Sequence, residues 1–305
     1  MKILLTGANG QLGKAIIKSQ PEGIELIQAS RDILNLSDFT ECRSAILSLR
    51  PDWVINCGAF TNVEKAESEE KMAIDINGFA PKVLAEELYK TGGKLIQIST
   101  DYVFNGEQNF PYSIDQKTSP INIYGYSKVI GEDYVKDILG VFNRGFVIRT
   151  SWLISSYGNN FVTKILKLLN EKDFINVIND QYSCPTSCIS LAKFCWHLIF
   201  NYQSKDLNKN QQIIYHFSDL GLANWYDLAL EIRHYAEKYS IINNPGIVKP
   251  INSFEFKTIA KRPKYSLLDC SDTFNKFKIK TYSWNNNLEN IMMKIKKQKI
   301  DFTNK

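Results

Sequence analysis

The sequence predicts an α/β protein: a doubly wound, parallel, Rossmann-like sheet with a smaller, interwoven α/β lobe. Two observations carry this prediction. Short apolar runs alternate with helical patterns through the first half of the chain, as in a parallel sheet that helices cover on both faces. The second half is less regular and has no internal repeat or low-complexity linker, which indicates a lobe that is woven into the sheet domain without a hinge.

The first half predicts five strands and four helices. We expect strands at 3–6, 24–29, 53–56, 95–99 and 145–149, and helices at 11–19, 39–49, 72–89 and 127–136. The second helix ends ahead of Pro51, because a residue before proline is pushed out of the helical region. The third contains Pro81, which can kink a helix, and Gly92-Gly93 close it. Right-handed crossovers between these strands give the doubly wound order.

The second half predicts fewer elements. Helices are expected at 161–169, 190–200 and 225–239, short strands at 175–178 and 213–217, and loops around 205–212 and 243–250. We expect residues 1–150 and about 187–217 to form the Rossmann domain, and about 151–186 and 218–305 to form the lobe.

Composition excludes several classes of protein. The 305 residues are 44% hydrophobic and 23% charged, an ordinary balance for a soluble globular chain. The net charge of +5 is too small to indicate nucleic-acid binding, and part of it lies in the run Lys294, Lys296, Lys297 and Lys299, which is typical of a solvated face or a fraying tail. No apolar run reaches the roughly 18 residues of a membrane span. With no secretory signal at the start, we expect a cytoplasmic protein.

The six cysteines are scattered through the chain and do not form a compact disulfide framework. Cys184, Cys188, Cys195 and His197 cluster loosely, but without a paired C-x-x-C they do not predict a zinc site. We expect buried, reduced thiols and no metal.

A glycine-rich turn follows the first predicted strand and opens the first helix. Its residues, Gly7-Ala8-Asn9-Gly10-Gln11-Leu12-Gly13, have the spacing G-x-x-G-x-x-G. Glycines permit a tight turn and a close approach to a pyrophosphate, and the helix start offers free N–H groups to phosphates. An ordinary strand–helix turn is the alternative, but the position of this one favours a dinucleotide site.

The end of the second strand indicates which dinucleotide. Arg31 suits the 2′-phosphate of NADPH, whereas an acidic residue there would bind the ribose 2′-hydroxyl of NADH. Asp32 is adjacent, so NADH remains an alternative, as does a purely solvated role for Arg31.

Tyr124 and Lys128 are spaced as Y-x-x-x-K, about one helical turn apart, so they share one helix face. A nearby ammonium would lower the phenol pKa from its usual value of about 10, as proton transfer near neutrality requires. This spacing is common by chance. Thr100 strengthens the prediction of a catalytic pair. It lies at the end of the fourth strand, where ligands bind in open α/β sheets, and its hydroxyl can point at the same substrate carbonyl oxygen as that of Tyr124.

Further motifs give the sequence a specific resemblance. They are residues 6–13, Ser99-Thr100-Asp101-Tyr102-Val103-Phe104, Asn122 to Lys128, Arg149-Thr150-Ser151-Trp152, Asn179-Asp180-Gln181-Tyr182 with Pro185-Thr186, and Arg262-Pro263 before Ser266 and Asp269. In combination they resemble the dTDP-4-dehydrorhamnose reductase family, of the extended short-chain dehydrogenase type, from residue 1 to about residue 295.

The resemblance implies reduction of the 4-keto group of dTDP-4-dehydro-6-deoxy-L-mannose to dTDP-L-rhamnose. It implies a catalytic set of Thr100, Tyr124 and Lys128, in which Tyr124 protonates O4, Lys128 binds the nicotinamide ribose and Thr100 positions the ketone. The cofactor-binding set is Gly7, Gly10, Gln11, Leu12, Gly13, Arg31, Cys57, Gly58, Ala59, Tyr124 and Lys128. The substrate-binding set is Thr100, Asp101, Tyr124 and Trp152, although Trp152 could also simply fill the core. The implied partner is a dTDP-sugar, and a homodimer is compatible with the sequence.

Several positions depart from the family pattern. Cys57-Gly58-Ala59 stands where an alanine run is usual, Ser183 where glycine is common, and Asn35 where aspartate is frequent. We expect Tyr265, after Arg262-Pro263, to alter the nucleotide or sugar end of the pocket. The carboxylate cluster that holds a bridging magnesium ion in some relatives cannot be placed on this sequence. These changes bear on the exact substrate more than on the reaction.

Two other functions remain open at this stage. Sugar-nucleotide epimerases and 4,6-dehydratases share the glycine turn and the Tyr/Lys pair, but such dehydratases carry Thr-Asp-Glu where this chain has Tyr102 after Thr100-Asp101. A non-catalytic cofactor-binding subunit, like the regulatory subunit of methionine adenosyltransferase, keeps the same fold and motifs.

Overall fold

Six parallel strands form the main sheet of the computed structural model, which describes residues 1–202, 212–280 and 282–298. In sheet order they are β10 (Ile214–His216), β5 (Gly145–Thr150), β4 (Lys94–Thr100), β3 (Trp53–Asn56), β1 (Lys2–Thr6) and β2 (Glu25–Ala29). The chain goes from β1 out to β2 and returns on the other side of β1 to form β3. The order therefore reverses between β1 and β3, where a doubly wound sheet opens a crevice for ligands. The predicted fold class is confirmed.

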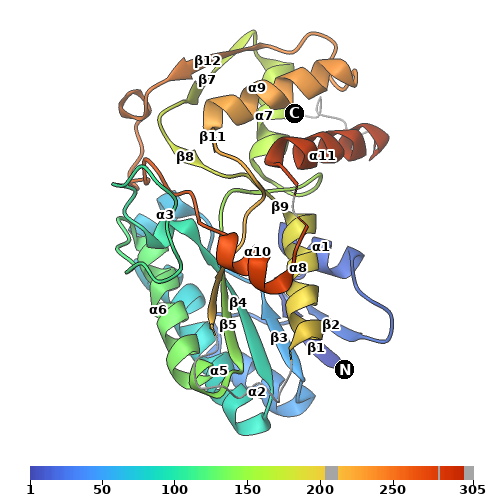
Figure 1. Ribbon diagram of the computed structural model, residues 1–305, viewed down its shortest axis with the longest axis vertical. Coiled ribbons are helices and arrows are strands. Elements are labelled where there is room, and N and C mark those ends of the chain that lie inside the picture. The colour runs from blue at the N-terminus through green and yellow to red at the C-terminus, as the bar shows by residue number, and fades with distance from the viewer. Residues whose placement is uncertain (203–211, 281, 299–305) are drawn as a thin grey trace.

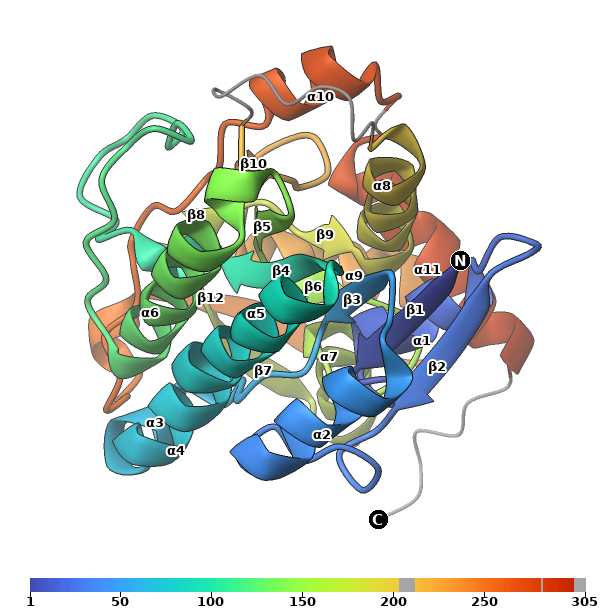
Figure 2. The ribbon, with the colours of Figure 1, turned by 90° about the horizontal axis from the view of Figure 1, so that it is seen from below.

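Helices cover both faces of this sheet (Figure 2). On one face lie α1 (Gln11–Lys18) and α8 (Cys188–Asn201), and on the other lie α2 (Phe39–Leu49), α5 (Ala80–Thr91) and α6 (Ile123–Ile138). Alternate residues of each strand point to opposite faces, so Ile3 packs with the first layer and Leu4 with the second. Such burial on both faces explains why the strands are apolar runs without polar alternation.

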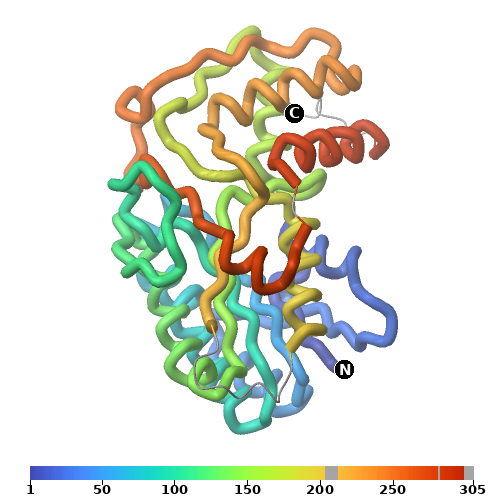
Figure 3. Tube along the Cα trace, viewed as in Figure 1, coloured from blue at the N-terminus to red at the C-terminus, as the bar shows by residue number. Residues whose placement is uncertain are grey.

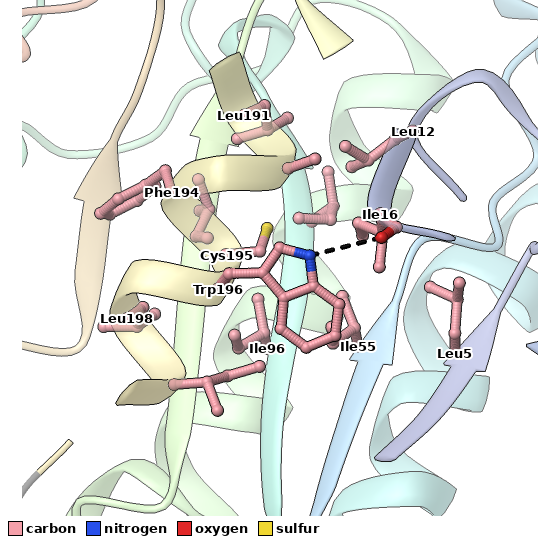
Figure 4. Packing of buried hydrophobic residues seen from close by; sticks show 14 of the residues in the cluster. Leu5, Leu12, Ile16, Ile55, Ile96, Leu191, Phe194, Cys195, Trp196 and Leu198 are labelled. Atoms are coloured by element: carbon pink, nitrogen blue, oxygen red, sulfur yellow. Dashed lines mark hydrogen bonds between the residues drawn. The ribbon is translucent and has the colours of Figure 1, made fainter. Parts of the chain in front are cut away.

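Within the layer formed by α1 and α8, the indole of Trp196 joins the two helices (Figure 4). Trp196 of α8 lies over Ile55 and Ile96 of the sheet, and its Nε1 donates a hydrogen bond to the carbonyl of Ile16, at 3.3 Å. The bond reaches across 180 residues of chain. A helix from the second half of the sequence thus completes the sheet domain.

The predicted helix over 72–89 forms as three pieces. α4 (Glu70–Ile74) continues through a π-helical turn, Asp75–Phe79, into α5. Pro81 lies in the first turn of α5, where its missing N–H is not needed, so the wide π turn takes the place of the predicted kink. Gly92 ends α5 in the left-handed conformation, with φ +86°, as a glycine cap does.

A separate lobe lies beyond the carboxyl ends of β4 and β5 (Figure 1). Its helices are α7 (Phe161–Glu171), α9 (Trp225–Lys238) and α11 (Trp284–Gln298), and their apolar faces share one core with Ile175 and Val248. Three pairs of short strands accompany them: β7 (Phe174–Ile178) with β12 (Ile247–Ile251), β8 (Tyr182–Ser183) with β11 (Ala223–Asn224), and β6 (Leu153–Ile154) with β9 (Thr186–Ser187).

One element of this lobe corrects a sequence expectation, and another, the helix α11, was not predicted. The region 243–250 was expected to be a loop, but it contains most of β12. The strand forms because it pairs in parallel with β7, and such pairing between distant segments cannot be predicted from the local sequence. The C-terminal lysines up to Lys297 lie on α11, where Lys296 and Lys297 are exposed as expected for a solvated face, while Lys299 lies outside the described residues. The sequence contains a pattern that could have predicted α11, since its buried residues recur at helical spacing: Leu288, Ile291, Met292 and Ile295. The predicted loop at 205–212 falls almost entirely outside the described residues.

The remaining α-helices of the described residues are α3 (Val63–Ser68) and α10 (Ser271–Phe277). Phe274 and Phe277 of α10 pack against the α1–α8 side of the sheet, so the second half of the chain returns to the sheet domain more than once (Figure 3). The division of the chain into a Rossmann domain and a lobe at the residues given above stays a proposal. No helix within the described residues is long and apolar enough to cross a membrane.

A buried ion pair links α6 to β5. Arg149 Nη2 lies 2.6 Å from Glu132 Oε2, and Nε lies 3.0 Å from Oε1, with only 3% and 4% of the two side chains exposed. Ser99 donates a further hydrogen bond to Glu132. Burial and the Arg149 charge lower the pKa of His216 to about 3, so its ring is neutral beside the guanidinium.

Glu132→Ala should lower the free energy of unfolding by about 3–5 kcal/mol, because the mutation leaves the Arg149 charge buried without its partner. Urea denaturation measures the loss. The control is Glu86→Ala on α5, since Glu86 is 36% exposed and pairs with Lys82 at 3.7 Å. We expect the control to cost less than about 1 kcal/mol. Equal costs for the two variants would contradict the buried pair's importance.

Candidate functional site

The site is a cavity of about 950 Å³ at the carboxyl ends of β1, β3, β4 and β5. It lies at the reversal of strand order, where the fold predicts it. Every site residue predicted from the sequence lines it: Gly7, Gly10, Gln11, Leu12, Gly13, Arg31, Cys57, Gly58, Ala59, Thr100, Asp101, Tyr124, Lys128 and Trp152. The structure therefore brings the predicted set together, while the role of each residue stays a prediction.

The glycine turn fits because its backbone leaves no room for side chains. Gly7 has φ +63°, and a Cβ on it would lie 2.7 Å from the nitrogen of Gly58. A Cβ on Gly13 would lie 2.3 Å from the carbonyl oxygen of Gly7. The amide of Gly10 donates to that same oxygen, at 2.9 Å, and closes the turn. The turn delivers the N–H groups at the start of α1 to the cavity, which is the arrangement that binds phosphates.

The ends of β1 and β3 are tied together below this turn. The hydroxyl of Thr6 donates to Asn56 Oδ1, and its oxygen accepts from the amide of Gly58, at 3.1 Å. Cys57 lines the cavity beside them, and burial raises the pKa of its thiol well above the usual value. The thiol is therefore protonated and unreactive at neutral pH.

The lobe also contributes to the end of the cavity that the glycine turn forms. Ser155 donates a hydrogen bond to Gln11 Oε1, at 2.8 Å, so the loop after β6 holds the first residue of α1. Gly158 and Asn159 of the same loop line the cavity. The sequence did not predict this contact, because it joins residues 144 positions apart.

Arg31 and Asp32 occupy different surroundings. Both are exposed, but only Arg31 belongs to the lining of the cavity within the described chain. This placement favours the 2′-phosphate interpretation of the arginine over the ribose interpretation of the aspartate.

Tyr124 and Lys128 lie one turn apart on α6, as predicted, but their electrostatics differ from the prediction. Burial raises the pKa of Tyr124 to about 12, with Asp101 raising it further and a hydrogen bond with Thr100 opposing. The ammonium of Lys128 donates to the carbonyl of Ile98, at 2.6 Å. Burial lowers the pKa of Lys128 to about 8. The expected lowering of the tyrosine pKa is thus wrong for this structure, because desolvation and the Asp101 charge together outweigh the hydrogen bond with Thr100.

A tyrosine with a raised pKa is nevertheless suited to one task. Tyr124 keeps its proton through neutral pH and can donate it to an oxygen that becomes strongly basic. Thr100 reaches the same phenol from the end of β4. The two hydroxyls and the Lys128 ammonium form the polar floor of the cavity.

Trp152 occupies an unusual backbone position. Its φ is +41°, a conformation that costs energy for a bulky residue and that marks functional positions in many proteins. Its ring stacks on Trp225, with centroids 3.5 Å apart, and Trp225 Nε1 donates to Gln181 Oε1, at 3.2 Å. The Nε1 of Trp152 is buried without a partner among the described residues, so it is free to donate to a ligand.

The lining also includes residues that sequence reasoning missed. They are Asn9, Leu34, Asn35, Leu36, the segment Phe60-Thr61-Asn62, Lys65, Glu69, Met72, Ile76, Ile98, Ser99, Thr150, Ser151, Leu153, Gly158 and Asn159. The segment after β3 had a usable signal, because it follows the carboxyl end of a predicted strand. Tyr265, expected to alter the pocket, instead packs on the cluster around Phe104 and Tyr112 and is not part of the lining within the described residues.

No group of three or more metal-ligating side chains is found within the described ranges. The six cysteines are free thiols, and Cys184 donates to the carbonyl of Asp219, at 3.0 Å. The loose cluster of cysteines in the sequence consists of separate packed side chains.

Comparison with known proteins gives a consistent result. The chain matches the family model described as RmlD substrate binding domain over residues 1–297. It is 35% identical over 270 residues to a dTDP-4-dehydrorhamnose reductase of Streptomyces griseus, covering 88% of this chain and 85% of the relative. A dTDP-4-keto-6-deoxy-D-glucose reductase of Streptomyces niveus is 32% identical, with 87% of each chain covered. The crystal structure of dTDP-4-dehydrorhamnose reductase from Bacillus anthracis, in complex with NADP, matches with a TM-score of 0.86 and 33% identity, covering 96% of this chain and 99% of that one.

Gly13→Ala should weaken nicotinamide dinucleotide binding by about tenfold or more, because its Cβ would collide with the Gly7 carbonyl and open the turn. Fluorescence titration measures the dissociation constant. Lys14→Ala, at the exposed neighbouring position of α1, is the control and should leave binding unchanged. Unchanged binding in Gly13→Ala would contradict the tight turn as the phosphate site.

Arg31→Ala should weaken NADPH binding by about tenfold or more and NADH binding by less than about twofold, since only NADPH offers a phosphate to the guanidinium. Asp32→Ala is the matched control and should affect neither. Equal losses for the two cofactors would remove the 2′-phosphate assignment.

Proposed function

The chain belongs to the family of dTDP-4-dehydrorhamnose reductases, and from this premise we propose that it reduces the 4-keto group of dTDP-4-dehydro-6-deoxy-L-mannose with NADPH, giving dTDP-L-rhamnose. The observation that carries the proposal is that Thr100, Tyr124 and Lys128 line one cavity of about 950 Å³, in which burial keeps the phenol of Tyr124 protonated. A ketone that receives a hydride needs such an acid at its oxygen.

The residues of the cavity suit NADPH. The turn from Gly7 to Gly13 leaves open the space that a Cβ would fill, and the start of α1 faces it. Arg31 would hold the 2′-phosphate, and Lys128 the nicotinamide ribose. NADPH, when bound, supplies a hydride to the carbonyl carbon of the sugar.

The protein's own residues then manage the proton. Tyr124 donates its proton to O4 as negative charge develops there, which completes the alcohol. Thr100 positions the phenol against the ketone oxygen, and its hydrogen bond with Tyr124 favours the phenolate that remains. Trp152 presents its free indole N–H from the lobe side, where the sugar nucleotide would lie.

Two alternative functions receive less support. Dehydration needs an acid and a base across C5 and C6, and the residue after Asp101 is a tyrosine whose pKa burial raises, in place of a glutamate. A purely regulatory subunit has no need for Thr100, Tyr124 and Lys128 to converge on one cavity. A reductase for a different dTDP-4-keto sugar is the stronger second candidate, since the S. niveus relative is named for dTDP-4-keto-6-deoxy-D-glucose.

Three further statements stay predictions from the sequence. They are that the chain works in the cytoplasm, that it has no nucleic-acid or membrane partner, and that it can pair as a homodimer.

Tyr124→Phe should lower kcat for dTDP-4-dehydrorhamnose reduction by about 100-fold or more, because the proton donor is lost while the ring is kept. The dissociation constant of NADPH should change by less than about twofold. NADPH oxidation is followed at steady state, with dTDP-4-keto-6-deoxy-D-glucose as the competing substrate.

Tyr126→Phe is the matched control, two residues away on α6 and 47% exposed, and it should retain wild-type kcat. Normal turnover in Tyr124→Phe would refute Tyr124 as the acid. Tight NADPH binding without turnover of either sugar by the wild-type protein would refute the reductase function itself.

A further inference from the structure

The carboxyl group of Asp101 is hydrogen-bonded on both sides. Its Oδ1 accepts from the hydroxyl of Thr100, at 3.1 Å. Its Oδ2 accepts from the hydroxyl of Ser266, at 2.5 Å, and from that of Ser183, at 3.3 Å, which lies equally close to the carbonyl oxygen of Ser266. Only 2% of Asp101 is exposed, so these three hydroxyls are its main partners in the described structure.

The two serines reach Asp101 from the lobe as one unit. Ser183 ends β8, and the amide of Ser266 donates to the carbonyl of Tyr182 in that strand, at 2.8 Å. The amide of Tyr182 in turn donates to the carbonyl of Lys264, at 2.7 Å. Thr100 approaches from the other side, at the end of β4. Asp101 therefore joins the lobe to the strand end that carries the catalytic hydroxyl.

Thr100 has a single hydroxyl proton and two places to direct it. One is Asp101 Oδ1, to which it donates, and the other is the oxygen of Tyr124, whose pKa a hydrogen bond with Thr100 lowers. When Tyr124 gives its proton to a substrate, the phenolate needs that hydrogen bond. Thr100 can supply it only if the Asp101 carboxylate remains satisfied without it.

We propose that Ser183 and Ser266 are positioning residues for the reduction: by holding the Asp101 carboxylate, they release the Thr100 hydroxyl to turn toward Tyr124 as that phenol loses its proton. The inference rests on the proposed reductase function and adds two residues from the lobe to its machinery. In the step itself the Tyr124 O–H bond breaks and the substrate O–H bond forms, while the Thr100 proton stays on Thr100 and only changes direction.

The surroundings of Asp101 agree with this arrangement. Burial raises the pKa of Asp101 to about 6, and the hydrogen bonds from Ser266, Thr100 and Ser183 oppose that rise. The other titratable groups that face it are the phenols of Tyr102 and Tyr124, and the charge of Arg262 acts on Tyr102. Losing a serine hydroxyl should therefore raise the Asp101 pKa.

The first test is a kinetic double-mutant cycle. Ser266→Ala should lower kcat by about tenfold and Ser183→Ala by about threefold, since its hydrogen bond is longer, with the NADPH dissociation constant within about twofold of wild type. In the Asp101→Asn background, Ser266→Ala should have no further effect, because the serine acts through the carboxylate. A loss that persists in that background, or one confined to KM, would overturn the proposal.

Two further variants distinguish a specific effect on kcat from a general folding defect. Ser218→Ala removes another buried hydroxyl, 2% exposed and bonded to the carbonyl of Asp219, and should keep wild-type kcat. Ser183→Gly removes the second serine hydroxyl with the residue that is common in the family at this position. It should match Ser183→Ala, and a wild-type kcat in both Ser183 variants together with Ser266→Ala would overturn the proposal.

A second measurement needs no substrate and so separates this inference from the reductase function. Carboxyl ¹³C NMR titration of the wild type should show two aspartates, Asp101 and Asp219, with a pKa of about 6, and the Asp101 signal is identified as the one that is missing in Asp101→Asn. Ser266→Ala should raise the pKa of that aspartate. An unchanged pKa would overturn the serine–Asp101 link even in a working reductase, whereas an inactive wild type would overturn only the proposed function.

Discussion

The whole site depends on the close approach of two glycine backbones, Gly7 after β1 and Gly58 after β3. Because Gly7 carries no Cβ, its backbone can approach that of Gly58 at the point where the strand order reverses, while the missing Cβ of Gly58 leaves room for the side chain of Leu36. This approach opens the crevice and aims the start of α1 into it. The cavity, the glycine turn and the neighbouring strand ends are therefore consequences of one local constraint on backbone packing.

Desolvation is the main force on the chemistry inside this crevice. It raises the pKa values of Tyr124 and Asp101 and lowers that of Lys128, and in each case it is larger than the nearest charge or hydrogen bond. The result is a neutral phenol at physiological pH beside an ammonium that keeps most of its charge. Hydrogen bonds oppose these shifts: the bond with Thr100 lowers the pKa of Tyr124, and the bonds from the lobe serines lower that of Asp101. The Thr100 bond thereby helps Tyr124 to give up its proton despite its raised pKa.

The lobe is tied to the sheet domain by polar contacts at the site and by apolar packing away from it. Ser155 donates a hydrogen bond to Gln11, Ser183 and Ser266 donate to Asp101, and Trp152, which stacks on Trp225, lines the cavity. Away from the site, α8 and α10 return from the second half of the chain to pack on the sheet. Because the lobe packs on the sheet in this way, the sheet domain fixes the positions of the lobe residues at the site.

The sequence by itself determined the parallel sheet, the glycine turn and the Thr100, Tyr124 and Lys128 set, because periodicity, turn chemistry and short motifs are local properties of the chain. It also placed Arg31 and Trp152 among the residues that line the cavity. Only the tertiary structure decided the serine pair on Asp101, strand β12 and the direction of the Tyr124 pKa. The first two join residues far apart in sequence, and the third depends on how much water the assembled cavity excludes. Contacts and burial of this kind belong to the folded chain and leave no local pattern to read.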